Sequence, residues 1–136
     1  MQHAHFVLDF SVTMARAFED ERNSYVDEVF SSFHYAIAHV PYIWSLEVDN
    51  VLLLSEKKSR IIHQQAIIFR QSLKKLPIVK DDRNESDFYE LAREFQLTTY
   101  DVSYLELAIR KRIPIATLDK PLRHAAKCGG VALYLE

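Results

Sequence analysis

Short apolar runs alternate with stretches of helical periodicity along the chain. The apolar runs predict strands at residues 5–8, 36–40, 77–79, 113–118 and 131–135. Between them, apolar residues three and four positions apart are typical of amphipathic helices, here at 10–18, 25–35, 41–57, 60–73, 82–95, 98–112 and 119–127. Pro41 is expected in the first turn of its helix, where its missing N–H is not needed. Short buried strands separated by helices favour a parallel sheet covered on both faces. The pattern therefore predicts an α/β fold with a central short parallel sheet flanked by helices.

The length and composition are those of one globular domain. The chain has 136 residues, of which 49% are apolar and 26% charged, so it can bury a core without disulfides. No repeat or linker interrupts it, and we expect a single domain over residues 1–136. The one cysteine, Cys128, excludes an internal disulfide and is not expected to build a thiolate zinc site. No base is expected beside Cys128, and no histidine pair has convincing zinc spacing.

Several classes of protein are excluded by what the sequence lacks. The only glycines are Gly129 and Gly130, so neither a dinucleotide fingerprint nor a P-loop can form. A net charge of −2 argues against coating nucleic acid by charge alone. It is compatible with a nuclease whose acids offset its basic residues. No apolar run reaches membrane length and no signal peptide is recognised, so a cytoplasmic protein is expected.

Two aspartates directly follow predicted strands. Asp9 comes after the strand at 5–8, and Asp119 comes after the strand at 113–118. In open parallel sheets, ligands bind beyond the carboxyl ends of the strands, so both carboxylates are expected at that edge. Each aspartate can instead cap the helix that follows it, and Pro121 suits a helix start. For either residue alone both interpretations remain open.

Two further acids lie on predicted helices. Glu47 belongs to an apolar stripe that also contains Trp44, Val51 and Leu54. A carboxylate facing a core is costly unless it is paired or binds a cation; a position at the rim or a basic partner is the alternative. Asp101 opens a helix, and with Thr98 it also resembles a capping box. Several carboxylates brought together repel one another, and hard oxygen ligands suit Mg²⁺ or Mn²⁺. The four acids together therefore predict a metal site.

These segments resemble the motifs of PIN-domain nucleases. Residues 6–12 (FVLDFSV) look like the family's opening motif, and residues 44–52 (WSLEVDNVL) resemble the helix with its glutamate. Residues 97–108 (LTTYDVSYLELA) and 115–119 (IATLD) are similar to the stretches with its third and fourth acids. The order and approximate spacing agree over nearly the whole chain. Within the family, the sequence looks most like VapC, the toxin of type II toxin–antitoxin pairs.

The resemblance implies a metal-dependent endoribonuclease. Asp9, Glu47, Asp101 and Asp119 would be the catalytic, metal-binding acids, and the products would carry a 5′-phosphate and a 3′-hydroxyl. The partners implied are an RNA substrate, a second copy in a homodimer and a VapB-like antitoxin. Ser11 and Thr117 are candidates for orienting the carboxylates, although a cap and a strand residue are equally simple roles. Contacts to RNA phosphates are possible, beside a plain surface role, for Arg16, Lys120, Arg123 and Lys127.

Other functions fit parts of the pattern. A general or DNA-directed nuclease would use the same acids. A PIN-fold module that binds nucleic acid without cutting it would keep the fold, but the presence of all four acids argues against it. A small phosphatase or receiver domain shares the aspartate at a strand end. We do not find its paired early acids or its late lysine.

Overall fold

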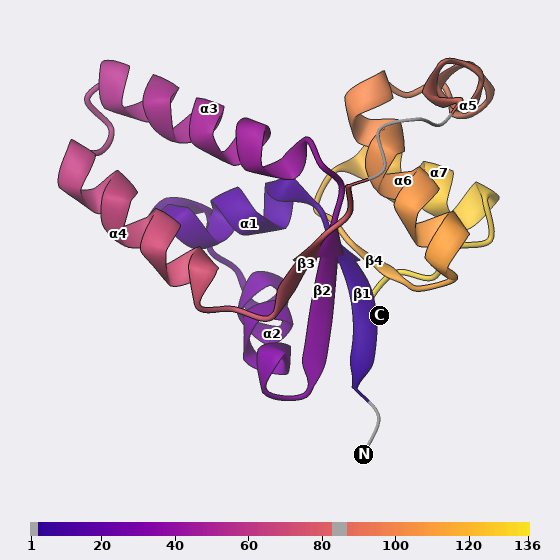
Figure 1. The fold of residues 1–136 in the computed structure, drawn as a ribbon, viewed down its shortest axis with the longest axis horizontal. Helices are drawn as coiled ribbons and strands as arrows, with labels where there is room; N and C mark the ends of the chain where they lie inside the picture. The colour runs from indigo at the N-terminus through magenta and orange to yellow at the C-terminus, as the bar shows by residue number, and fades with distance from the viewer. Residues whose placement is uncertain (1–2, 83–86) are drawn as a thin grey trace.

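The computed structural model describes residues 3–82 and 87–136. The strands are β1 (Ala4–Leu8), β2 (Ala36–Val40), β3 (Ile78–Lys80) and β4 (Ile115–Ala116), in the spatial order β3-β2-β1-β4. Each neighbouring pair is parallel. The sheet lies at the centre of the molecule (Figure 1). The expected α/β fold with a short parallel sheet is therefore confirmed.

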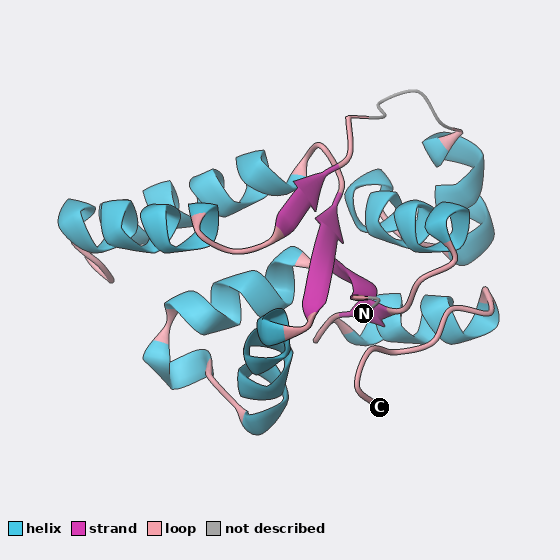
Figure 2. Cartoon of the chain, turned by 60° about the horizontal axis from the view of Figure 1, so that its bottom comes forward, coloured by secondary structure: helices cyan, strands magenta, loops and turns pink. Residues whose placement is uncertain are grey.

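Helices cover the sheet on two sides. On one side lie α1 (Phe10–Ala17), α2 (Ser24–Ser31), α3 (Trp44–Lys57) and α4 (His63–Lys74), and on the other lie α5 (Phe88–Phe95), α6 (Thr99–Lys111) and α7 (Lys120–Cys128) (Figures 1 and 2). Two short 3-10 turns, Glu19–Glu21 and Ser32–His34, join these helices to their neighbours. The arrangement has three layers, helix–sheet–helix, as the apolar pattern predicted.

Strand β1 passes through the middle of the core. Its last three residues, Phe6, Val7 and Leu8, are fully buried, which explains why it reads as a continuous apolar run and not as an alternating one. Phe6 stacks on Tyr134 with ring centroids 4.0 Å apart. The C-terminal segment is thus anchored against the central strand.

The predictions for the two strands nearest the C-terminus were wrong. Where a strand was expected at 131–135, only Leu133 makes an isolated bridge, with Ile115. Just beyond it, the Glu136 N–H bonds back to the Leu133 carbonyl, so the segment turns before a ladder can grow. The strand expected at 113–118 is correspondingly reduced to two residues. Burial of the apolar side chains, and not strand pairing, produces the apolar pattern here.

Three helix starts also differ from expectation. Pro41 lies in a turn, where its own carbonyl accepts the Trp44 N–H. Helix α3 therefore begins at Trp44, three residues later than predicted. Helix α4 begins at His63, because Ser59 has a left-handed φ of 58° and Ile62 is extended. The helix expected from residue 82 begins at Phe88, after its N-cap Asp87. Its expected first part overlaps residues 83–86, which lie outside the described residues. Of the described helices, none has the length and apolar character to span a membrane.

Candidate active site

Asp9 lies where β1 ends and α1 begins. Its backbone N–H donates to the Ala116 carbonyl of β4 (3.0 Å), which places it at the carboxyl edge of the sheet. Its side chain also accepts the Ser11 N–H at 3.4 Å as the N-cap of α1. The capping interpretation is thus correct for Asp9. It leaves most of the carboxylate's bonding capacity for other partners.

Two hydroxyl groups hold one oxygen of the Asp9 carboxylate. Oδ2 accepts hydrogen bonds from Ser11 Oγ (2.5 Å) and Thr117 Oγ1 (2.8 Å). The hydroxyl oxygens in turn accept the Leu118 and Asp119 N–H groups, both at 3.0 Å. With backbone donors on their oxygens, both hydroxyls direct their protons at Oδ2. Ser11 and Thr117 therefore fix the orientation of the Asp9 side chain, as the sequence suggested.

The other oxygen of Asp9 is buried without a partner. Only 1% of the residue is exposed, and Oδ1 forms no hydrogen bond with the described residues. Burial raises the pKa of Asp9 to about 6, although the Ser11 and Thr117 hydrogen bonds oppose the shift. Buried polar atoms are normally paired, so an isolated carboxylate oxygen indicates a position that suits a proton or a cation.

Glu47 reaches the same region from the first turn of α3. Its Oε1 accepts a 2.6 Å hydrogen bond from the hydroxyl of Tyr104 on α6, and Tyr104 is fully buried. Burial raises the pKa of Glu47 to about 7; the Tyr104 hydrogen bond opposes this, and the charges of Asp9 and Asp101 add to it. The partner is a tyrosine and not the basic residue considered from the sequence.

Asp101 and Asp119 complete the group of four acids. The Asp101 N–H donates to Thr98 Oγ1 at 3.0 Å, so the expected helix cap is present. Its carboxylate is half-buried, and burial, with the nearby charge of Asp119, raises its pKa. Asp119 caps α7 by accepting the Leu122 N–H at 3.0 Å. Asp101 also contributes to the raised pKa of Asp9, so Asp101 interacts electrostatically with Asp9, Glu47 and Asp119.

The four acids do not form a ready-made ligand cage. Among the described residues, no three side chains of histidine, cysteine, aspartate or glutamate are close enough together to hold one ion. Mg²⁺ usually keeps several waters and needs only one or two direct carboxylate ligands. The hard oxygen donors, with the isolated Oδ1 of Asp9 among them, are of the chemical type that such an ion binds.

A cavity of about 430 Å³ is lined by one of these four acids, Asp119. Ser11, Leu118 and Asp119 line one part of it, and Val51 and Arg60 line another. No local pattern pointed to Arg60, because its partners Glu21 (2.7 Å) and Asp20 (2.9 Å) lie 39 and 40 residues away along the chain. The cavity offers space for part of a substrate next to the carboxyl edge of the sheet.

The four basic residues named as candidates for contact with RNA phosphates have different surroundings. Arg16 pairs with Asp27 at 3.4 Å near the far end of α1. Arg123 donates to the Thr117 carbonyl at 2.9 Å and pairs with Glu136. Both arginines thus have partners within the chain, and Arg123 supports the loop that carries Thr117. Lys120 and Lys127 are exposed. Contact of any of the four with RNA stays a prediction.

One expectation about Cys128 was wrong. No base was expected beside this cysteine, but His124 Nε2 lies 3.6 Å from the Cys128 sulfur. The two residues are four positions apart on α7, a spacing that puts side chains on the same helix face. The four-residue spacing of His124 and Cys128 could therefore have predicted this contact from the sequence.

Comparison with known proteins shows a fold and no family. No protein-family model and no curated protein matches the chain. Among solved structures, the chain is similar to the crystal structure of PAE2754 from Pyrobaculum aerophilum, with a TM-score of 0.69 and 20% sequence identity. The match covers 90% of this chain and 79% of that one. A likeness at this identity concerns the fold alone.

Proposed function

We propose that this protein is a Mg²⁺- or Mn²⁺-dependent endoribonuclease of the PIN-domain type. The observation that carries the proposal is the Asp9 carboxylate, which is buried at the carboxyl edge of the sheet and has one oxygen that bonds to none of residues 3–82 and 87–136. Three further acids, Glu47, Asp101 and Asp119, lie in the electrostatic network around it. Mutual repulsion of such acids is relieved by a divalent cation.

The residues of the chain would prepare this site in distinct ways. Ser11 and Thr117 hold Oδ2 of Asp9, so Oδ1 would be the principal ligand of a metal. Tyr104 bonds one oxygen of Glu47, and the other oxygen would be available to the metal or its water. A bound metal would supply an activated water and neutralise charge on the scissile phosphate. Asp101 and Asp119 would add the negative field that attracts the cation.

The motif resemblance supports a proposal about the biological setting. The four segments around Asp9, Glu47, Asp101 and Asp119 resemble those of VapC toxins in order and approximate spacing. We therefore propose a cytoplasmic toxin of a toxin–antitoxin pair that works as a homodimer and is inhibited by a VapB-like antitoxin. Its substrate would be RNA, cut by water without a covalent enzyme intermediate.

The central test is RNA cleavage by the Asp9→Asn variant. The purified wild-type chain with Mn²⁺ should cleave a structured RNA, and Asp9→Asn should lower the rate by at least 100-fold while the circular dichroism spectrum is preserved. Asp49→Asn is the matched control, because Asp49 is exposed and pairs with Arg70 at 2.8 Å. It should keep near wild-type activity. Cleavage that persists in Asp9→Asn, or in excess chelator, would contradict the proposal.

A second candidate is a PIN-fold module that binds nucleic acid without cutting it. The lack of three converging ligands among the described side chains favours it. Retained RNA binding, with no cleavage of RNA or DNA by wild type in either metal, would select this function over catalysis. Cleavage of DNA as well as RNA would point to a general nuclease.

A further inference from the structure

The pair His124 and Cys128 lies on α7, apart from the acids discussed above. Both side chains are exposed, and Nε2 lies 3.6 Å from the sulfur. Cys128 is the last residue of α7, and His124 stands one turn before it. Neither residue takes part in the proposed chemistry, and both can be reached from solvent.

The separation of the two atoms is that of two ligands on one tetrahedral ion. Zinc binds cysteine sulfur at about 2.3 Å and histidine nitrogen at about 2.0–2.1 Å. With a tetrahedral angle between these bonds, the sulfur and nitrogen stand about 3.5–3.6 Å apart. The 3.6 Å in the structure matches this value, so both atoms can bind one ion with little movement of their side chains.

The position on the helix also favours a cation. The carboxyl end of a helix carries partial negative charge from unpaired carbonyl groups, and α7 ends at this cysteine. The exposed Lys127 is the neighbouring positive charge; its long side chain can extend into water. Sulfur and imidazole nitrogen suit zinc-class cations, whereas Mg²⁺ and Mn²⁺ prefer oxygen.

We propose that His124 and Cys128 form a second metal site, which binds a zinc-class divalent cation. Two protein ligands hold the ion, and water occupies its remaining positions. The single cysteine argued against a thiolate zinc site at the level of the sequence. The structure supplies an imidazole as the second ligand. This site is independent of the proposed nuclease function.

The test is titration of the freshly reduced, full-length protein with Cd²⁺, a zinc-class ion whose bond to thiolate gives an ultraviolet charge-transfer band. Wild type should show the band. Cys128→Ser should lose it, and His124→Gln should weaken Cd²⁺ binding at least tenfold. Because thiol ionisation accompanies binding, the affinity should rise with pH. Asp49→Asn is the control, because Asp49 is exposed, pairs with Arg70 and belongs to neither proposed site; this variant should bind Cd²⁺ as wild type does.

Two results would overturn the site. They are the lack of a band in wild type and an affinity unchanged by His124→Gln. The second would mean that the cysteine binds the ion alone. Both substitutions on α7 replace exposed side chains, so folding should be preserved. Failure of RNA cleavage would leave this result untouched.

Discussion

Tyr104 shows how a single residue can set the state of a neighbouring acid. It is fully buried on α6 and its hydroxyl donates to Glu47 Oε1 on α3 at 2.6 Å. The hydrogen bond favours the charged carboxylate, against burial and the charges of Asp9 and Asp101. The resulting pKa of about 7 reflects a balance of opposing effects, of which Tyr104 is the one that holds the pKa down.

We predict that Tyr104→Phe raises the pKa of Glu47 further. The variant loses the donor to Oε1, so the neutral carboxyl is favoured, and folding stability should fall by about 1 kcal/mol. Carboxyl NMR titration of the metal-free protein measures the pKa directly. Tyr100→Phe is the matched control, because Tyr100 is an exposed tyrosine on the same helix. A Glu47 titration that is the same in Tyr104→Phe and wild type would contradict the assignment.

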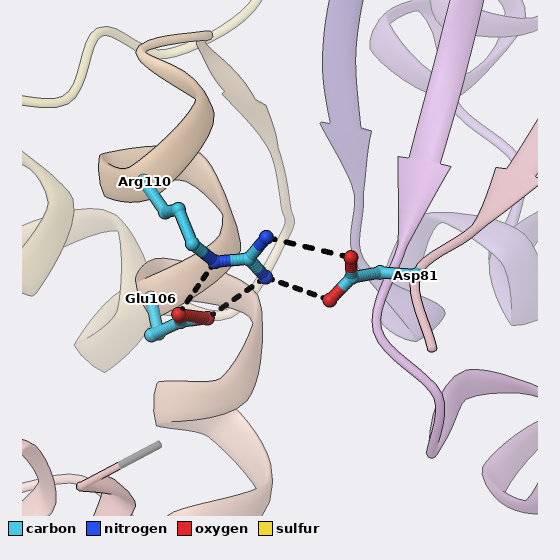
Figure 3. A network of polar contacts seen from close by, with 3 residues as sticks. All are labelled: Asp81, Glu106 and Arg110. Atoms are coloured by element: carbon cyan, nitrogen blue, oxygen red, sulfur yellow. Dashed lines mark hydrogen bonds and ion pairs between the residues drawn. The ribbon is translucent and has the colours of Figure 1, made fainter. Parts of the chain in front are cut away.

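At the scale of elements, α6 is tied to the edge of the sheet by one arginine. Arg110 donates to Asp81, which follows β3, at 2.6 Å and to Glu106 at 2.8 Å (Figure 3). The Asp81 and Glu106 side chains are only 12% and 11% exposed. Because α6 also carries Asp101 and Tyr104, this network fixes the helix that delivers two of the site's residues.

We predict that Arg110→Met lowers the free energy of unfolding by about 2–3 kcal/mol, because charged hydrogen bonds are lost and Asp81 keeps a poorly solvated charge. Urea denaturation measures the change. The matched control is Arg70→Met, which breaks the exposed Asp49–Arg70 pair, 47% and 42% exposed, and should cost less than about 1 kcal/mol. Equal losses in the two variants would show that the network contributes no more than a surface pair.

At the scale of the whole molecule, the acids make stability depend on pH. The pKa of Asp9 rises from 3.8 to about 6 on folding, so the folded state binds more protons than the unfolded state between these values. Ionisation of Asp9 therefore destabilises the metal-free fold, with no effect below pH 4 and the full effect above pH 6. Glu47 acts in the same direction, between pH 4.5 and about 7.

We predict that Asp9→Asn is more stable than wild type at pH 8 in chelator, by up to about 3 kcal/mol. The gain should shrink as the pH falls to 4, because wild-type Asp9 is then neutral. Urea unfolding at both pH values measures the difference. Asp49→Asn should follow the wild-type pH dependence. An Asp9→Asn variant less stable than wild type at pH 8 would show that the charged carboxylate is well accommodated.

Local sequence patterns predicted the helices and strands of the fold, but not where every one of them begins and ends. Strands such as Ala36–Val40 and helices such as Phe10–Ala17 were predicted within two residues of their ends, because burial periodicity is written in neighbouring residues. The strand predicted at residues 131–135 does not form, because a strand also needs a partner along its length. In this segment only Leu133 makes a bridge. The N-cap roles of Asp9 and Asp119 were visible as well, since capping is a local hydrogen bond.

The sequence by itself determined the fold class, the acids that follow strands, and the hydroxyl residues beside them, since each depends on residues a few positions apart. Only the tertiary structure decided that Oδ1 of Asp9 is buried with no hydrogen-bond partner among the described residues. It alone also paired Tyr104 with Glu47, 57 residues away, and Arg110 with Asp81, 29 residues away. The physical reason is that burial and pairing across the sheet depend on how distant elements pack, which local periodicity does not encode.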